Sequence, residues 1–265
     1  ALTFLSREEE FDELFRSAPQ KVLAVIPASL EKKSKGFPQT FIYSKNPRLT
    51  FAKILNNFFN EQTVQGIAKS AIIETDGIIH NTVAIGEHCS IRGEIDIGEF
   101  SEIYDNVTIS GNVFIGKNVR IKSGTVIGQK GFGFVLNENK IPIGIPHFGS
   151  VVIGDNVELG ALNTVVQGTL GDTIISDNVK TDDHVHIAHG VKIGKNTLIT
   201  ACVEISGSVD IGENVWIGPN SSIIDHIQIG DNVFIGIGAV VTKSLTDAVV
   251  AVGNPAKVIK KNNTN

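Results

Sequence analysis

The amino-acid sequence predicts an all-β solenoid, a parallel β-helix, with a small α/β domain in front of it. Three observations support this fold class. An apolar residue returns every six positions from residue 67 onward, Gly and Asn recur at fixed places between those positions, and residues 1–62 lack the repeat. The repeat is considered first because it decides the whole architecture of a chain.

The six-residue repeat is carried mainly by isoleucine. After residues 129–150 the register resumes at Ile153, slips by four residues across Gly168–Gly171, and continues to Val241. A period of six fits neither an α-helix nor a plain alternating strand. It fits a short strand and a turn, in which Ile and the small residue two positions earlier share the inward face. Before the interruption, Ile recurs without a gap at positions 67, 73, 79, 85, 91, 97, 103, 109, 115, 121 and 127.

The turns of the predicted coils are marked by Gly and Asn, which tolerate tight backbone conformations. Each coil buries its Ile against those of the neighbouring coils, so the predicted core is a column. This pattern resembles the left-handed β-helix acyltransferases, in which three hexapeptides, and hence 18 residues, form one triangular coil. The resemblance implies a left-handed solenoid, although crossovers between parallel strands are generally right-handed.

Residues 1–62 show the patterns of helices and strands instead of the repeat. Ser6-Arg7-Glu8-Glu9 matches a capping box, ahead of a helix with Phe11, Leu14 and Phe15 on one face. Strands are predicted at Lys21–Ala28 and Thr40–Ser44, and a second helix with the apolar residues Phe51, Leu55, Phe58 and Phe59. The expected domains are therefore 1–62 (α/β), 63–245 (β-helix) and 246–265 (a C-terminal tail).

The interruption at 129–150 is the longest departure from the repeat. It begins with Gly131-Phe132-Gly133-Phe134 and ends with Ile145-Pro146-His147-Phe148-Gly149. Long loops that leave a regular domain are usually functional. Because these apolar side chains cannot join the core, we expect a neighbouring subunit or a ligand to cover them. Closed symmetry is usual for homo-oligomers, and we predict a homotrimer with sites between subunits.

The composition limits the classes of partner. A net charge of −5 argues against nucleic acid, since phosphate binding requires clustered Lys and Arg. No apolar run approaches 18 residues and no signal segment is visible, so we expect a cytoplasmic protein that does not enter the membrane. The two cysteines, Cys89 and Cys202, give neither a disulfide framework nor a metal-ligand spacing. We expect no bound metal or cofactor.

Candidate chemistry lies where histidines gather. In an 18-residue coil, residue n stacks on residue n+18, which places His189 against Gly207 and His186 against Glu204. His suits the role of general base because its pKa of about 6.5 is near working pH. An exposed N–H beside Gly lets a thioester carbonyl approach closely, as an oxyanion site requires. Amide formation from a thioester needs this pair and no covalent enzyme intermediate.

Four segments resemble the UDP-3-O-acylglucosamine N-acyltransferase family and related acyltransferases of nucleotide-linked amino sugars. They are Tyr43–Leu49, Gly131–Phe134, Val151–Ala161 and Ile187–Gly190. The resemblance covers nearly the whole chain, including the N-terminal domain, which binds the nucleotide base in that family. It implies His189 as the base, Gly207 as the oxyanion donor, and substrate contacts from Tyr43, Asn46, His226, Phe132, Phe134 and His186.

The chain departs from this family at several positions. It has Val165-Val166-Gln167-Gly168 where the family has Ile-Asp-Arg-Gly. It also has Asp182-Asp183 where the family has Asp-Asn before the His, and Gly190 where the family has Asn after it. The family's helical extension for acyl carrier protein is not seen, and the Gly253–Val258 segment resembles coenzyme A-dependent sugar acetyltransferases. These departures favour acyl-coenzyme A as co-substrate, with contacts from Gly207, Lys243 and Lys257, and a dTDP- or UDP-linked amino sugar as acceptor. The alternative is UDP-3-O-acylglucosamine N-acylation from acyl carrier protein.

Three other functions share this fold. A sugar O-acyltransferase would form an ester instead of an amide. A γ-carbonic anhydrase would need three zinc ligands, and His184, His186 and His189 have the wrong alternation for one tetrahedral site. A purely structural β-helix would show flat, repetitive faces, which this sequence lacks.

Overall fold

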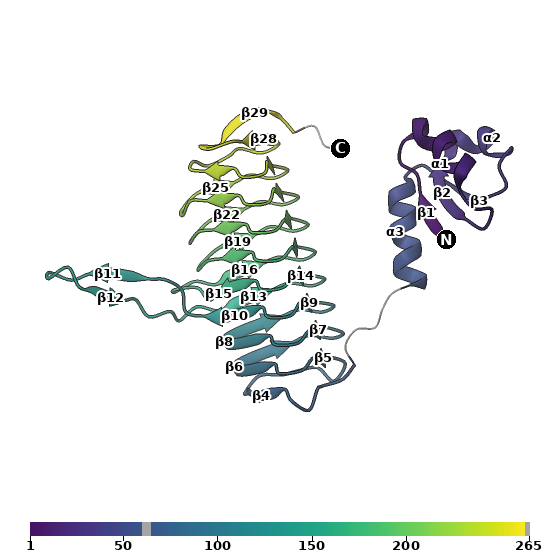
Figure 1. Ribbon diagram of the computed structural model, residues 1–265. Coiled ribbons are helices and arrows are strands. Elements are labelled where there is room, and N and C mark those ends of the chain that lie inside the picture. Colours follow the sequence, from purple (N-terminus) through teal and green to yellow (C-terminus); the bar gives the residue numbers. More distant parts are fainter. Residues whose placement is uncertain (60–64, 263–265) are drawn as a thin grey trace. The chain divides into compact units, whose positions relative to one another are not determined.

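The computed structural model describes residues 1–59 and 65–262. The chain divides into two compact units, Ala1–Thr63 and Val64–Asn265, close to the boundary expected from the start of the repeat. Figure 1 shows a small α/β unit and a long solenoid. None of the helices in the described residues combines the length and apolar character needed to span a membrane.

The N-terminal unit is a three-stranded parallel sheet with helices, and its core is aromatic. Phe11 and Phe15 are fully buried and lie 5.0 Å apart between ring centroids. The sheet order is β1-β2-β3. The elements are β1 (Leu2–Phe4), η1 (Glu8–Glu10), α1 (Phe11–Ser17), β2 (Leu23–Pro27), η2 (Ala28–Leu30), α2 (Glu31–Ser34), β3 (Thr40–Ser44) and α3 (Pro47–Phe58).

Two expectations for this unit need correction. The capping box at Ser6 is wrong, because the first turn is a 3₁₀ helix whose N-cap, Arg7, makes no side-chain cap hydrogen bond. Glu8 instead accepts a hydrogen bond from Ser29 of a neighbouring segment. The second helix is present, but Phe58 is 78% exposed and Phe59 lies beyond the helix end. Only Phe51 of its predicted apolar residues makes a ring contact, with Phe4.

The second unit is the predicted β-helix, built from two sheets of short strands. The 14-stranded sheet contains β4 (Ile72–Thr75), β6 (Ser90–Ile97), β8 (Thr108–Ile115), β10 (Val126–Gln129), β13 (Val151–Ile153), β15 (Thr164–Val166), β16 (Thr173–Ile175), β18 (His186–Ile187), β19 (Lys192–Ile193), β21 (Glu204–Ile205), β22 (Asp210–Ile211), β24 (Ser222–Ile223), β25 (Gln228–Ile229) and β27 (Val240–Val241). The 10-stranded sheet contains β5 (Ala84–Ile85), β7 (Glu102–Ile103), β9 (Arg120–Ile121), β14 (Glu158–Leu159), β17 (Lys180–Thr181), β20 (Leu198–Ile199), β23 (Trp216–Ile217), β26 (Phe234–Ile235), β28 (Val249–Val252) and β29 (Lys257–Lys261). Apart from the antiparallel pair β28–β29, the ladders of both sheets are parallel.

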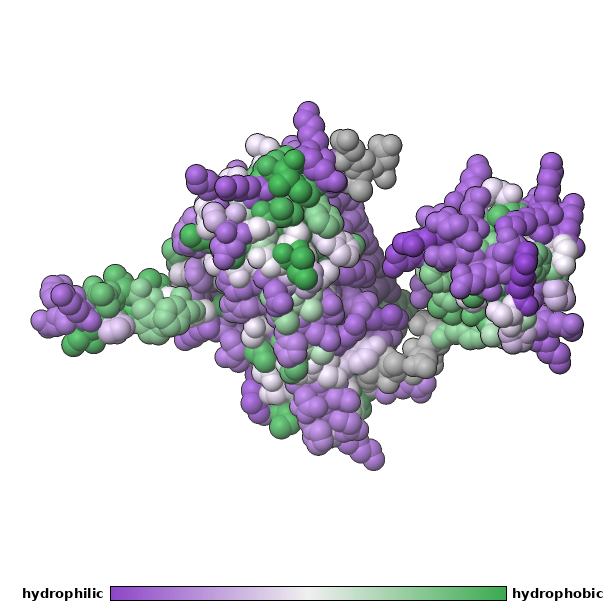
Figure 2. Space-filling view, turned by 45° about the horizontal axis from the view of Figure 1, so that its top comes forward, coloured by the Kyte–Doolittle hydropathy of each residue, from purple (hydrophilic) through white to green (hydrophobic). Residues whose placement is uncertain are grey.

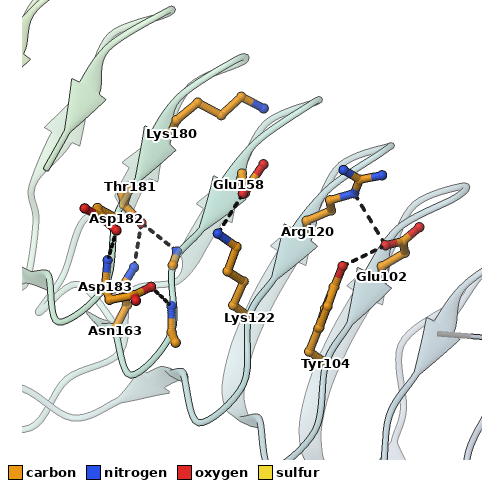
Figure 3. Close-up of polar contacts among 12 residues, drawn as sticks. Glu102, Tyr104, Arg120, Lys122, Glu158, Asn163, Lys180, Thr181, Asp182 and Asp183 are labelled. Carbon is orange, nitrogen blue, oxygen red and sulfur yellow. Dashed lines mark hydrogen bonds and ion pairs between the residues drawn. The ribbon is translucent and has the colours of Figure 1, made fainter. Parts of the chain in front are cut away.

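The repeat residues form the core, as predicted. From Ile85 to Val241 each of them is at most 5% exposed. Burial of each such side chain contributes about 1.5–3 kcal/mol relative to exposure. The one polar member, Thr181, is compatible with the core because its Oγ1 accepts hydrogen bonds from Gly160 N at 3.1 Å and Asn163 Nδ2 at 2.5 Å (Figure 3).

The outer surface of the 10-stranded sheet carries a ladder of charges (Figure 3). Arg120 pairs with Glu102 at 3.4 Å, and Lys122 pairs with Glu158 at 3.0 Å. All four side chains are partly exposed, so each pair contributes about 1 kcal/mol or less. These pairs therefore contribute little to the stability of this face.

The interruption at 129–150, here named the arm, leaves the solenoid as a hairpin of β11 (Phe134–Leu136) and β12 (Pro142–Gly144). Figure 1 shows it projecting from the solenoid, and Figure 2 shows apolar residues along it up to a hydrophilic tip. Phe132 is 89% exposed and Ile143 is 49% exposed. Within the expected tail, β28 extends the 10-stranded sheet and β29 folds back antiparallel on it.

Candidate active site

The predicted stacking of His189 on Gly207 is present in the structure. His186 of β18 pairs with Glu204 of β21 across 18 positions, so the turns that follow these strands also stack. A Cβ added to Gly207 would lie 2.5 Å from Cε1 and 2.7 Å from Nε2 of His189. Only glycine therefore allows the imidazole to lie against the backbone at this turn.

The Gly207 N–H is an unpaired donor. In a regular turn of this solenoid, the equivalent N–H of Glu213 donates to Oδ1 of Asp231, 18 residues further on, at 2.7 Å. The residue 18 positions after Gly207 is Asp225, whose carboxylate instead lies 3.7 Å from Nε2 of His226. Within the described ranges, no acceptor receives the Gly207 N–H. An N–H left free beside a histidine is what an oxyanion site requires.

His189 and Gly207 line one small cleft of about 240 Å³. Its polar side is made by His186, Glu204 and Ser206, with Ser206 Oγ donating to Glu204 Oε1 at 2.9 Å. Glu204 and Ser206 were not predicted as site residues from the sequence, although the 18-residue spacing already placed Glu204 beside His186. The full lining is Gly131, Phe132, Val166, His186, Ala188, His189, Glu204, Ser206 and Gly207.

A second cleft, of about 540 Å³, reaches His189 from the other side of the turn. Lys192 of β19 and Asp210 of β22 lie in it, together with the apolar side chains of Leu170 and Ile174. His189 thus lies between two clefts, one on the face of β18 and β21 and one on the face of β19 and β22. Such an arrangement suits a reaction between two substrates.

The surroundings of His189 favour the neutral imidazole. Burial is the largest cause that lowers its pKa below the ordinary value of 6.5, followed by the charges of His147 and His226. The Asp225 carboxylate acts in the opposite direction. A base must be unprotonated to accept a proton, so this lowering keeps His189 competent in mildly acidic solution.

A second imidazole behind His189 was not selected from the sequence. His147, at the base of the arm, has its ring centroid 5.6 Å from that of His189 with the rings at 73°. It is only 4% exposed. No simple spacing joins residue 147 to residue 189, because the arm breaks the register between them.

The other predicted residues of the solenoid differ in their relation to the cleft. Phe132 lines it, whereas Phe134 lies further along the arm with its ring centroid 4.9 Å from that of Phe132 and the two rings tilted by 60°. His226 donates its backbone N–H to Gly207 O at 3.1 Å, and its side chain is 73% exposed. Lys243 lies in the same turn column as His189, but neither it nor Lys257 of β29 reaches the cleft. Both lysines are exposed.

Tyr43 and Asn46 lie in the N-terminal unit at the end of β3. Tyr43 is 41% exposed and its hydroxyl lies 2.8 Å from Ser34 Oγ. Asn46 is the N-cap of α3, and its Oδ1 accepts from Leu49 N at 3.1 Å. This cap explains Asn46 structurally, so a binding role must be separated from a stabilising one by experiment.

The three histidines considered for zinc do not converge. His184 lies in the turn before β18, His186 in β18 and His189 in the turn after it. In the part of the chain that the structure describes, no group of three or more His, Cys, Asp or Glu side chains could hold a metal ion.

Known proteins resemble this chain in sequence. The bacterial transferase hexapeptide (six repeats) family matches residues 172–207 and 208–243. The UDP-3-O-acylglucosamine N-acyltransferase of Coxiella burnetii is 35% identical over 195 residues, covering 66% of this chain and 57% of that protein. The enzyme of that name from Pseudomonas syringae pv. tomato is 41% identical over 190 residues, covering 64% and 54%. This chain thus spans somewhat more than half the length of these relatives.

Solved structures resemble the solenoid. The UDP-N-acetylglucosamine O-acyltransferase of Moraxella catarrhalis superimposes with a TM-score of 0.68 at 26% identity, over 74% of this chain and 75% of that one. A chain from Acinetobacter baumannii described as LpxA gives a TM-score of 0.57 at 25% identity, over 74% of each chain. The left-handed β-helix and the resemblance to hexapeptide-repeat acyltransferases are therefore confirmed.

Proposed function

We propose that this chain moves an acyl group from a thioester to the amino group of a uridine diphosphate-linked amino sugar. The observation that supports this most is the His189 imidazole lying on Gly207, whose N–H has no acceptor among the described residues. A base and an oxyanion donor then meet at the wall of one cleft. All the relatives named above are acyltransferases.

The reaction follows from these two groups. The sugar nitrogen attacks the thioester carbonyl carbon, and His189 accepts the proton that the nitrogen loses. The carbonyl oxygen gains negative charge and is stabilised by the Gly207 N–H. When the C–S bond breaks, the proton on His189 passes to the departing thiolate. The products are an amide and a free thiol, and the enzyme is unchanged.

Glu204 favours an amine over a hydroxyl as acceptor. Its carboxylate lines the same cleft as His189 and already accepts one hydrogen bond from Ser206. A carboxylate attracts the ammonium form of an amino sugar and holds its nitrogen near the base. An O-acyltransferase is the second candidate, because the structural relative from Moraxella catarrhalis carries that name. The two differ in product, an amide or an ester.

The names of the relatives help to choose between the two pairs of substrates predicted from the sequence. The favoured pair was coenzyme A with a dTDP- or UDP-sugar, and the alternative was acyl carrier protein with UDP-3-O-acylglucosamine. The names of the sequence relatives agree better with the alternative. We therefore propose that the nucleotide of the acceptor is uridine diphosphate, and we include both acyl carriers in the test. Lys243 and Lys257 remain proposed contacts of a coenzyme A donor.

The other proposed contacts belong to the sugar nucleotide and to the assembly. Tyr43 and Asn46 would bind the nucleotide, and His226 would bind the sugar or a phosphate. His186, Phe132 and Phe134 would enclose the acceptor. A homotrimer would cover the exposed apolar side chains of the arm.

A thiol-release assay tests this function. Acetyl-coenzyme A, hydroxyacyl-coenzyme A and acyl carrier protein thioesters are each combined with UDP- and dTDP-amino sugars. The expected result is thiol release that depends on a UDP-amino sugar and gives a product resistant to hydroxylamine, as an amide is. A hydroxylamine-sensitive ester would support O-acylation instead. No sugar-dependent thiol release with any pair would overturn the proposal.

A further inference from the structure

His147 reaches His189 from a different part of the fold. It belongs to the last residues of the arm, and its ring meets the His189 ring edge to face at 5.6 Å between centroids. Offset and edge-to-face arrangements are the favourable geometries for such rings. Among the described residues, no hydrogen bond orients the His189 side chain, so this ring contact lies where an orienting group would be expected.

The hydrogen bonding of His147 defines its tautomer. Nδ1 lies 3.0 Å from the carbonyl oxygen of Ile145, and a carbonyl can only accept, so Nδ1 carries the proton. In the neutral ring Nε2 then bears a lone pair. That nitrogen is buried and has no hydrogen-bond partner within residues 1–59 and 65–262. A buried acceptor without a partner is unfavourable and requires an explanation.

The backbone around His147 is shaped to bring the two imidazoles together. A Cβ on Gly131 would lie 3.0 Å from His147 Nε2 and 3.3 Å from His189 Cδ2. A Cβ on Gly133 would lie 3.0 Å from His147 Cε1. The buried Gln167 side chain donates to His147 O at 2.8 Å and fixes the backbone. A side chain at position 131 would crowd both rings, and Val166 Cγ1 at 2.8 Å as well.

We propose that His147 is a positioning residue, whose buried ring packs against His189 and holds that imidazole over Gly207. It takes the place that a carboxylate occupies behind many catalytic histidines. This inference rests on the proposed function only in that it takes His189 as the base. A carboxylate would stabilise the protonated base, whereas an imidazole opposes its protonation.

The charge effect of His147 acts together with other groups around His189. A proton on His147 repels a proton on His189, so His147 is one cause of the lowered pKa of His189, after burial. The titratable groups that face His189 come from the arm, the neighbouring turns and both clefts. They are His147, His226, Asp225, His186, Glu204, Asp172, Lys192 and Asp210.

Two substitutions separate packing from charge. His147→Ala removes both, whereas His147→Phe keeps a ring of similar shape and removes the charge. In His147→Ala we expect turnover to fall about 10²-fold, the usual effect of misplacing a reacting group by about 1 Å. His147→Phe should restore most of that turnover. If both variants match wild type, or if both lose turnover equally while folded, the positioning role is wrong.

The titration of His189 in the free protein gives a readout that needs no substrate. The seven histidines are followed by NMR between pH 5 and 8, with His189 assigned from its own substitution. Both His147 variants should move the His189 midpoint to higher pH. The control is His88→Asn, an exposed turn histidine at a position type where Asn recurs, and it should leave the midpoint unchanged. An unmoved His189 midpoint in His147→Ala, which loses the packed ring, would overturn the inference, even if the proposed function fails its own assay.

Discussion

Gly207→Ala is the most direct perturbation of the proposed site. The new Cβ would lie 2.5 Å from His189 Cε1, whereas carbon atoms in contact are normally about 3.5–4.0 Å apart. The imidazole must therefore move by about 1 Å, and such a displacement commonly lowers turnover about 10²-fold. The changed position of the His189 imidazole relative to the Gly207 N–H should lower kcat more than it changes the Michaelis constants.

The same substitution should leave the fold intact. The backbone at Gly207 does not adopt a positive φ, and the atoms in conflict belong to a side chain that can rotate away. A glycine-to-alanine change at a compatible position stabilises a protein by about 0.4–1 kcal/mol. We therefore expect a thermal midpoint close to that of wild type. The cost falls on activity and not on stability.

Thiol release under saturating substrates measures this prediction. Gly36→Ala is the control, because a Cβ there meets no atom within 4 Å and the backbone φ is not positive. Turnover of folded Gly207→Ala within about threefold of wild type would refute the proposed contact between base and oxyanion site. Loss of turnover together with a large fall in thermal midpoint would point instead to the packing of the turn.

Three further predictions concern the base, the nucleotide contacts and the assembly. His189→Ala should lower turnover about 10²–10⁴-fold and remove the acidic limb of the pH profile. In wild type the midpoint of that limb should lie below the ordinary imidazole pKa, because burial and neighbouring charges lower the pKa of His189. An unaltered pH profile with turnover within about tenfold of wild type would exclude His189 as the base. Tyr43→Ala and Asn46→Ala should raise the Michaelis constant for the sugar and leave that for the thioester unchanged. Asn46→Asp keeps the helix cap, so it shows whether the effect of Asn46→Ala comes from the lost cap or from a lost ligand contact. Equal effects on both substrates would indicate damage to the small unit. Sedimentation of the wild-type protein at micromolar concentration should give a trimer. Ile143→Lys in the arm should dissociate it, because the Ile143 side chain is 49% exposed in the single chain. A wild-type monomer would contradict the predicted trimer.

The repeat made most of the fold predictable. A six-residue period can be satisfied only by coils in which every repeat residue is internal, and Ile85 to Val241 are indeed buried. The period also predicted which residues stack, so the pair His189 and Gly207 followed from arithmetic alone. Strand Thr40–Ser44 was predicted with its observed bounds, because it is a short β-branched and aromatic run between turn residues.

The failures have a common physical origin. Strand Leu2–Phe4 has three residues and the helix Glu31–Ser34 has four, too few for a period to be visible. The Ser6 capping box matched a pattern, but the N-cap is Arg7, one residue later, and it makes no side-chain cap hydrogen bond. His147 could not be placed, because the arm has no repeat and its base is fixed by contacts with distant residues such as Gln167.

The proposed site lies where the repeat fails. Val126 pairs with Thr164 across 38 positions and Thr164 with His186 across 22, whereas His186 pairs with Glu204 across 18. The arm and the four-residue insertion at Gly168–Gly171 therefore leave the solenoid at the same corner, and the regular 18-residue pairing resumes after them. A regular turn has each N–H capped and each side chain packed, so it has no free group for catalysis. At this corner the arm supplies His147, the next turn supplies His189, and the turn below it leaves the Gly207 N–H unpaired. A solenoid tolerates such insertions because each coil contacts only its neighbours, which explains how a reactive corner coexists with an otherwise uniform core.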